Sequence, residues 1–212
     1  YLARPASRDD IKSVFAGIRP LVKTGSGAST AALSRDHTIL IDPDSGMMTV
    51  VGGKWTTYRK MAEDVVDRVS VLAKLPAAEC VTESLPIHGH HTDPESLGRL
   101  SCYGSDAEAI QSMIDSGAGQ SIHPSLEMTG AEVVWACRNE MARTVEDVLS
   151  RRSRSLIFDA RAASEAAENV AGLMATELGR DGSWAADQVS SFHRLAEDYT
   201  ITPSHSSDDP YR

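Results

Sequence analysis

The stretch GGKWTTYR at residues 52–59 decides the architecture of this chain, because it joins a predicted strand to a predicted helix. Residues 47–51 before it are apolar and β-prone, whereas apolar residues after it recur every three or four positions from Met61 to Leu72. Glycines allow backbone to approach a ligand closely, and the first N–H groups of a helix are free donors at its positive end. Lys54 adds a full positive charge. The junction is therefore suited to an anion or to an electron-rich cofactor edge.

The same junction has a purely structural interpretation. Paired glycines between a strand and a helix commonly do no more than turn the chain, and short motifs of this kind are only moderately specific. The residue pattern alone leaves both interpretations open.

Upstream of the junction the sequence predicts short strands from about residue 13 to residue 51. The turn sequence DPDSG at 42–46 lies between two β-prone runs, 38–41 and 47–51, which is typical of a hairpin. Downstream, the periodicity predicts one amphipathic helix from Thr57 to about Leu75, and Pro76 marks its end.

The remainder of the chain is predicted to be helical after a linker. Prolines and a glycine interrupt residues 77–97, and helical periodicity returns over residues 98–200. Short polar joints favour a compact antiparallel bundle, and we expect the tail at 201–212 to be disordered. The fold class is therefore α+β, with strands and one helix first and an all-α domain after them. Four helices are expected, marked by the apolar residues of 110–114, 134–148, 163–173 and 189–199.

Composition excludes several classes of function. The 212-residue chain is 41% hydrophobic and 24% charged with a net charge of −9, which argues against nucleic acid as a principal partner. No window holds the roughly 20 consecutive apolar residues of a membrane span. Cys80, Cys102 and Cys137 lack the paired spacing of a zinc site or redox dithiol, so we expect reduced thiols.

Several motifs together resemble one family. GGKWTTYRKMAED at 52–64 resembles the signature of the FAD-dependent glycerol-3-phosphate dehydrogenases, the quinone-linked enzymes of bacterial and mitochondrial inner membranes. Two upstream motifs, AGIRPLV at 16–22 and SRDH at 34–37, resemble further family motifs in the same order. EVVW at 132–135 and RTVEDVLSRRSR at 143–154 resemble the family's carboxy-terminal helical domain. The similarity extends to about Leu195.

The resemblance implies a cofactor, a substrate and a set of site residues. It implies that residues 1–76 form part of an FAD- and substrate-binding region, and that glycerol 3-phosphate is oxidised to dihydroxyacetone phosphate with electrons passing to quinone. Arg19 and Lys54 become the candidate catalytic residues, and Arg35 joins them around the substrate phosphate. Guanidinium suits this role because its fork donates two parallel hydrogen bonds. The implied cofactor-binding residues are Gly52, Gly53, Lys54, Trp55 and Thr56.

The resemblance also implies partners. No Gly-x-Gly-x-x-Gly follows a predicted strand, so the element that would hold a dinucleotide pyrophosphate is missing. We expect this chain to be a carboxy-terminal portion that needs an amino-terminal FAD-binding half and is inactive without it. The full-length enzyme would be cytoplasmic and peripherally associated with the inner membrane, and a homodimer is left open.

Two alternatives and several structural assignments accompany this hypothesis. The chain could instead be a non-catalytic helical interaction module with degenerate motifs, or part of a glycerophosphate oxidase that gives electrons to oxygen. His37 at a strand start is interpreted as structural rather than catalytic. The histidines of 88–91 lack spaced acidic or thiol partners, so no metal site is predicted. The arginines of 151–154 are expected to end a helix, where cations oppose its negative end.

Overall fold

The computed structural model describes residues 4–18 and 36–201. The chain divides into two compact units. One, the helical unit, comprises Tyr1–Ala16 and His88–Arg212, and the other, the hairpin–helix unit, comprises Gly17–Ile87. The start of the chain thus belongs with the helical unit.

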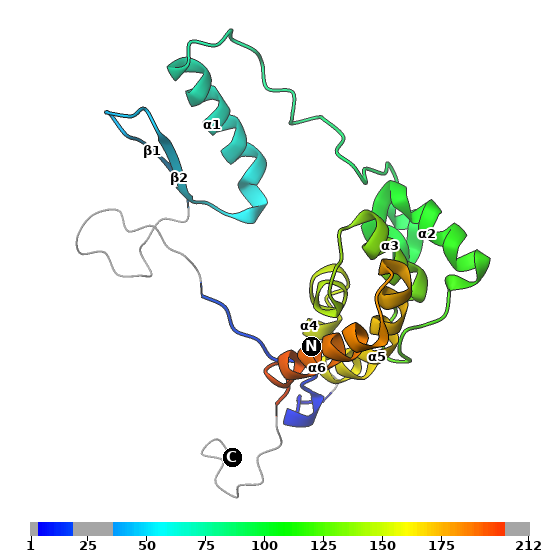
Figure 1. The fold of residues 1–212 in the computed structure, drawn as a ribbon. Coiled ribbons are helices and arrows are strands. Elements are labelled where there is room, and N and C mark those ends of the chain that lie inside the picture. Colours follow the sequence, from blue (N-terminus) through cyan, green and yellow to red (C-terminus); the bar gives the residue numbers. More distant parts are fainter. Residues whose placement is uncertain (1–3, 19–35, 202–212) are drawn as a thin grey trace, which may run out of the picture. The chain divides into compact units, whose positions relative to one another are not determined.

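The hairpin–helix unit contains the predicted hairpin and the predicted helix (Figure 1). Strand β1 (His37–Ile41) pairs antiparallel with β2 (Met48–Gly52), in a register that places His37 opposite Gly52. The side chain of Asp42 closes the turn by accepting hydrogen bonds from the backbone N–H and the hydroxyl of Ser45, at 2.8 and 2.7 Å. Helix α1 (Tyr58–Leu72) follows the short 3₁₀ turn η3 (Trp55–Thr57). Both predictions are confirmed, and the helix ends three residues earlier than expected.

The expectation of strands from residue 13 is wrong for the described residues before 19, which form no strand after the 3₁₀ turn η1 (Arg8–Asp10). Their backbone groups form hydrogen bonds with later parts of the helical unit instead. Val14 donates to the carbonyl of Tyr199 at 2.9 Å, and the carbonyl of Lys12 accepts from Ala160 at 3.1 Å. The Lys12 ammonium also lies 2.8 Å from Asp159. Extended backbone here is therefore satisfied by helix ends rather than by a neighbouring strand.

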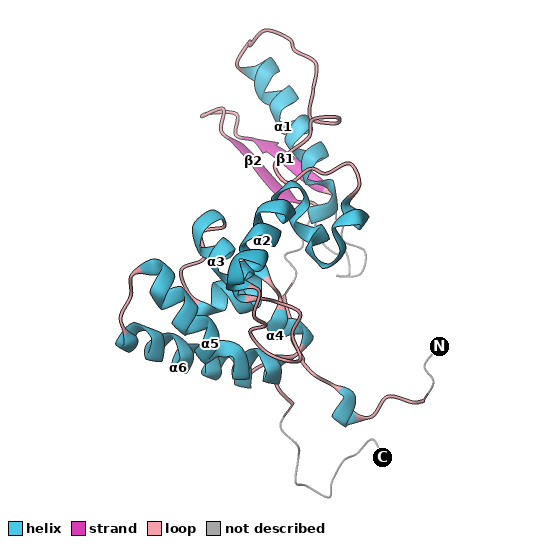
Figure 2. Cartoon of the chain, turned by 90° about the vertical axis from the view of Figure 1, so that its right-hand side faces the viewer, coloured by secondary structure: helices cyan, strands magenta, loops and turns pink. Residues whose placement is uncertain are grey.

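The helical unit is built from five α-helices and the turns between them, within the described residues. Figures 1 and 2 show α5 and α6, the two longest, lying side by side. The helices are α2 (Ala107–Met113), α3 (Gly130–Asn139), α4 (Ser155–Phe158), α5 (Ala160–Leu178) and α6 (Gly182–Glu197). The connecting turns are the 3₁₀ segment η4 (Pro94–Asp106) and the π-helical turns η5 (Ile114–Ala118) and η6 (Asp147–Arg152).

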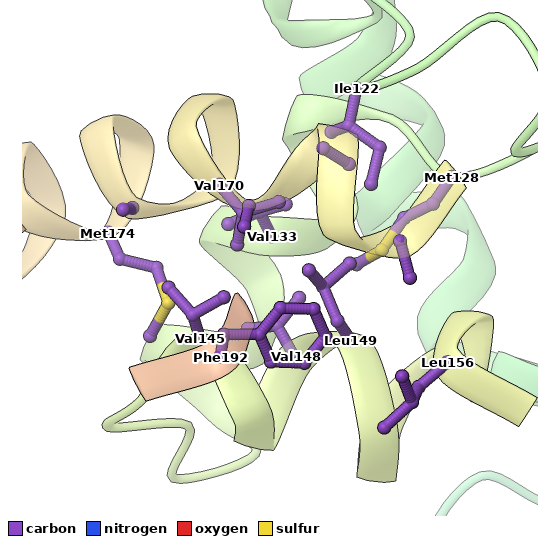
Figure 3. Close-up of a cluster of buried hydrophobic side chains, with 14 of the residues drawn as sticks. Ile122, Met128, Val133, Val145, Val148, Leu149, Leu156, Val170, Met174 and Phe192 are labelled. Atoms are coloured by element: carbon purple, nitrogen blue, oxygen red, sulfur yellow. The ribbon is translucent and has the colours of Figure 1, made fainter. Parts of the chain in front are cut away.

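A continuous hydrophobic core lies between α3, η6, α4, α5 and α6 (Figure 3). Alanines on the inner face of α5 allow neighbouring helices to approach closely, and larger side chains fill the remaining space. The large, fully buried members are Val133, Val145, Val148, Leu149, Leu156, Val170, Met174 and Phe192. A smaller cluster of Leu100, Ala107, Ile110 and Ala131 joins η4 and α2 to the start of α3.

The joint between α5 and α6 follows from local sequence. Gly179 ends α5 in the left-handed conformation, with φ of 62°, and Asp181 caps α6 by accepting a hydrogen bond from the Trp184 N–H at 2.9 Å. This is one of the short polar joints that the sequence predicts between the helices.

The prediction of one long helix through Val134 and Val148 is wrong. Helix α3 ends at Asn139, and Met141 takes a left-handed conformation with φ of 57°. Two arginines bind the carbonyl groups that the break leaves free: Arg143 donates to the carbonyl of Cys137 at 3.1 Å, and Arg152 donates to that of Glu140. Because the two arginines bind these carbonyl groups, the end of α3 leaves them with hydrogen-bond partners, and the chain can turn before η6.

Among residues 4–18 and 36–201, no helix combines the length and the apolar character that crossing a bilayer requires.

Candidate cofactor and substrate site

The turn that follows β2 is held open by two glycines in the left-handed conformation. Gly52 has a φ of 78° and Gly53 a φ of 87°, and residues other than glycine rarely adopt such backbone angles. A Cβ built on Gly53 would lie 2.4 Å from the sulfur of Met61 on α1. The flexible end of Met61 could move aside, so the left-handed backbone is the stronger structural reason for glycine at position 53.

Lys54 is exposed at the start of η3. Its carbonyl accepts hydrogen bonds from the N–H and the hydroxyl of Thr57 at 3.0 and 3.1 Å, which fix the backbone of the turn. In the described part of the chain, the Lys54 ammonium has no hydrogen-bond or ion-pair partner. Helix α1 has no acidic residue in its first turn and no side-chain cap. The N–H groups of Thr57 and Tyr58 already bond to the carbonyls of Lys54 and Trp55, so the positive end of the helical segment lies at η3, beside the unpaired charge of Lys54.

Two aromatic side chains lie beside Lys54. The rings of Trp55 and Tyr58 stack with centroids 5.2 Å apart and planes inclined by 24°. Trp55 is 85% exposed and Tyr58 is 52% exposed, so the pair presents an uncovered flat surface. Thr56 is also exposed. Tyr58 was not among the predicted site residues, although its position in GGKWTTYR could have suggested it.

Charged side chains connect α1 to its surroundings. The imidazole of His37 lies 3.0 Å from Asp64, and Lys60 lies 3.1 Å from the other oxygen of that carboxylate. Lys60 and Arg59 also bind Glu63, at 2.8 and 2.7 Å, and their hydrogen bonds lower the pKa of that carboxyl. The sequence alone does not indicate Asp64 as a partner of His37, because the two meet only once the strand register and the helix are both formed. The structural interpretation of His37 stays a prediction.

Two hollows lie on the hairpin–helix unit. A groove of about 520 Å³ runs between α1 and residues 75–82 and is lined mainly by apolar side chains, among them Val66, Val71 and Val81. A smaller hollow of about 370 Å³ is lined by His37, Ile39, Asp64, Asp67 and Arg68.

The described residues contain no cluster of three or more His, Cys, Asp or Glu side chains that could hold a metal ion. His88, one of the histidines considered in the sequence, lies 2.7 Å from Asp106 in the helical unit. The cysteines Cys80, Cys102 and Cys137 are all free thiols, and burial raises the pKa of the Cys137 thiol.

The structure brings together only one part of the predicted site. Gly52, Gly53, Lys54, Trp55 and Thr56 form a single turn at the start of α1, as the motif predicted. Arg19 and Arg35 lie outside the described residues, so their positions relative to Lys54 stay predictions.

Comparisons with known proteins agree on one family. The family model described as the C-terminal domain of alpha-glycerophosphate oxidase matches residues 47–187. A mitochondrial glycerol-3-phosphate dehydrogenase of Arabidopsis thaliana is 31% identical over 234 aligned residues, which cover 94% of this chain and 37% of that protein. Glycerol-3-phosphate dehydrogenase 1 of Mycobacterium tuberculosis (strain H37Rv) is 37% identical over 160 residues, covering 68% of this chain and 30% of that protein. The chain thus spans about a third of these curated relatives.

A solved structure shares the fold. The glycerol-3-phosphate dehydrogenase from Bacillus halodurans, complexed with FAD, superposes with a TM-score of 0.68 at 21% identity. The match covers 96% of this chain and 43% of that one. The predicted α+β fold class is confirmed.

Proposed function

Because the chain belongs to the family of the C-terminal domain of alpha-glycerophosphate oxidase, we propose that it is part of an FAD-dependent enzyme that oxidises sn-glycerol 3-phosphate to dihydroxyacetone phosphate. The observation that carries this proposal is the turn at residues 52–56, where the unpaired ammonium of Lys54 lies at the positive end of the continuous η3–α1 helical segment. The names of the relatives and the FAD in the related structure support the choice of substrate and cofactor.

The turn fits the pyrimidine edge of a flavin. FAD, when bound, would supply the acceptor for the hydride taken from the secondary alcohol. The bare backbone of Gly52 and Gly53 allows close approach, and the positive end of the η3–α1 segment would face the negative charge. Lys54 would stabilise the negative charge that develops on the reduced ring, which is the kind of interaction that lowers a barrier.

The substrate phosphate would be held by three cations. Arg19, Arg35 and Lys54 occupy the positions that the family motifs assign to the substrate anion. Charge-assisted hydrogen bonds to a phosphate contribute roughly 1.5–3 kcal/mol each, so three of them would orient a small dianion firmly. The residue that accepts the alcohol proton is left unassigned.

The surface of the hairpin–helix unit supports an amino-terminal FAD-binding half as partner. None of residues 36–87 has a buried side chain. Large apolar side chains are exposed along α1 and after it: Val66, Val69, Val71, Leu72, Leu75 and Val81. Covering such surface is favourable by about 25 cal/mol per Å², so this unit is suited to completing a larger domain.

Two electron acceptors are candidates for this chemistry. We favour quinone, with the full-length enzyme at the periphery of an inner membrane, because the relatives are named dehydrogenases and include mitochondrial proteins. Oxygen is the second candidate, since the matching family model is named for an oxidase. Two assays separate quinone from oxygen as the acceptor: reduction of a quinone analogue without oxygen, and production of hydrogen peroxide in air.

Replacing Lys54 tests the site in the holoprotein, with the amino-terminal half present. Lys54→Met should lower kcat/KM for glycerol 3-phosphate by about 100-fold or more, because it removes a charge that stabilises the transition state. Lys74→Met, the same change beyond the other end of α1, should leave kcat/KM unchanged. Equal values for the two variants would remove Lys54 from the site.

Arg19 is tested in the same assay. Arg19→Ala should raise KM for glycerol 3-phosphate or lower kcat/KM without lowering the melting temperature, and an unchanged kcat/KM would exclude it as a substrate ligand. The chain alone should neither retain FAD nor reduce a dye with glycerol 3-phosphate. Robust turnover by the chain alone would refute the need for an amino-terminal half.

A further inference from the structure

The hairpin and α1 are joined by few non-covalent contacts. No side chain of residues 36–87 is buried, so no hydrophobic core fixes the angle between the hairpin and the helix. The described side-chain contacts that connect them are specific: His37 of β1 to Asp64 of α1, and Met61 of α1 beneath Gly53. Their orientation must therefore depend on these contacts and on the covalent turn.

His37 occupies the centre of this arrangement. It is the first residue of β1, and the sheet register places it opposite Gly52. A Cβ on Gly53 would lie 3.4 Å from that of His37, so His37 also lies against the glycine turn. Its imidazole then reaches Asp64, at 3.0 Å, in the second turn of α1.

The His37–Asp64 contact is partly shielded from water. The two side chains are 21% and 33% exposed, so their interaction is screened less than that of a fully exposed pair. Lys60 lies on the far oxygen of Asp64, at 3.1 Å, but both of these residues belong to α1. Within the described residues, only the histidine connects this carboxylate to the hairpin.

We propose that His37 and Asp64 are positioning residues for the flavin turn. By holding the start of β1 against α1, the pair sets the direction in which Lys54 and η3, the amino-terminal end of the helical segment, face. Neither side chain has to touch the cofactor, because both act through Gly52 and Gly53. This inference rests on the proposed function for the identity of the cofactor.

The test measures FAD affinity of the holoprotein by flavin fluorescence, in a double-mutant cycle. His37→Ala and Asp64→Ala should each weaken FAD binding about 3- to 10-fold, the range expected for the loss of one partly shielded hydrogen bond. The double variant should lose no more than either single variant. Asp64→Asn retains an acceptor oxygen and should recover much of the affinity.

Lys60→Ala is the matched control, because it removes a cation from the same carboxylate without breaking the link to the hairpin. It should leave FAD affinity within about twofold of the wild type. The flavin midpoint potential should fall in Asp64→Ala and stay unchanged in Lys60→Ala, since misaligned positive charge stabilises the reduced ring less. A general loss of stability would not by itself lower the midpoint potential in Asp64→Ala while leaving it unchanged in Lys60→Ala.

The outcomes distinguish this inference from the function on which it rests. If the wild-type holoprotein binds no FAD, the proposed function fails. If it binds FAD but His37→Ala, Asp64→Ala and Lys60→Ala all bind equally well, or the two single losses add in the double variant, the positioning role is overturned.

Discussion

Glu132 shows how much one carboxylate does in the helical unit. It is 7% exposed, and it accepts hydrogen bonds from the N–H and the hydroxyl of Thr129, at 2.8 and 2.9 Å, which cap the start of α3. Arg99 of η4 lies 2.7 Å from the same oxygen, and Tyr103 donates to the other at 3.3 Å. Burial raises the pKa of Tyr103 strongly, and the neighbouring charge of Glu132 adds to the shift. One residue thus joins η4 to α3.

Glu132→Gln should destabilise the helical unit by about 1–2 kcal/mol, because it removes the countercharge of the partly exposed Arg99 and weakens the cap. Urea unfolding followed by circular dichroism measures the change. Glu127→Gln is the control, since Arg99 meets only the carbonyl of Glu127. A loss below about 0.5 kcal/mol, the range of ordinary surface changes, would contradict this account of Glu132.

At the scale of elements, predictions held where the determining interactions are local. The hairpin follows from the turn residues 42–46, and α1 from its own periodicity, so both could be predicted from the sequence. The break after α3 could not, because the carbonyl of Glu140 is bound by Arg152, twelve positions later. The apolar residues from Val134 to Val148 keep helical spacing across the break, so their pattern does not predict that Arg152 caps the carbonyl of Glu140.

Met141 at this break gives a test of the local conformation. Its left-handed backbone costs a non-glycine residue about 1 kcal/mol or more, and its side chain is 76% exposed, so little contact is lost on truncation. Met141→Gly should therefore be more stable than Met141→Ala by about 1 kcal/mol, measured as the difference in thermal unfolding. In a continuous helix the order would reverse, because glycine is the poorer helix former.

At the scale of the whole molecule, the two units differ in what stabilises them. The helical unit encloses a core of fully buried side chains, whereas the described residues of the hairpin–helix unit have none. A two-stranded hairpin with one helix is marginally stable in water without further packing. The unit that carries the candidate site is therefore the one with less internal packing to stabilise it.

Hydrogen exchange should resolve this difference. In the chain alone, backbone amides of β1, β2 and α1 should exchange at least about 100-fold faster than those of α5, because opening costs them little free energy. Adding the amino-terminal half with FAD should slow exchange in α1 and leave α5 unchanged. Equal protection of α1 and α5 in the chain alone would show that the hairpin–helix unit is stable by itself.

The sequence by itself determined the hairpin, α1, the helical character of the rest and the contiguous turn at residues 52–56, because these depend on residues that are neighbours along the chain. The roles of Arg19 and Arg35 stay predictions. Only the tertiary structure decided that residues 12–14 bind the helical unit, that α3 breaks at Met141, and that His37 meets Asp64. All three features depend on contacts between residues that are distant in the sequence. Local periodicity does not report such contacts, so it could not predict them.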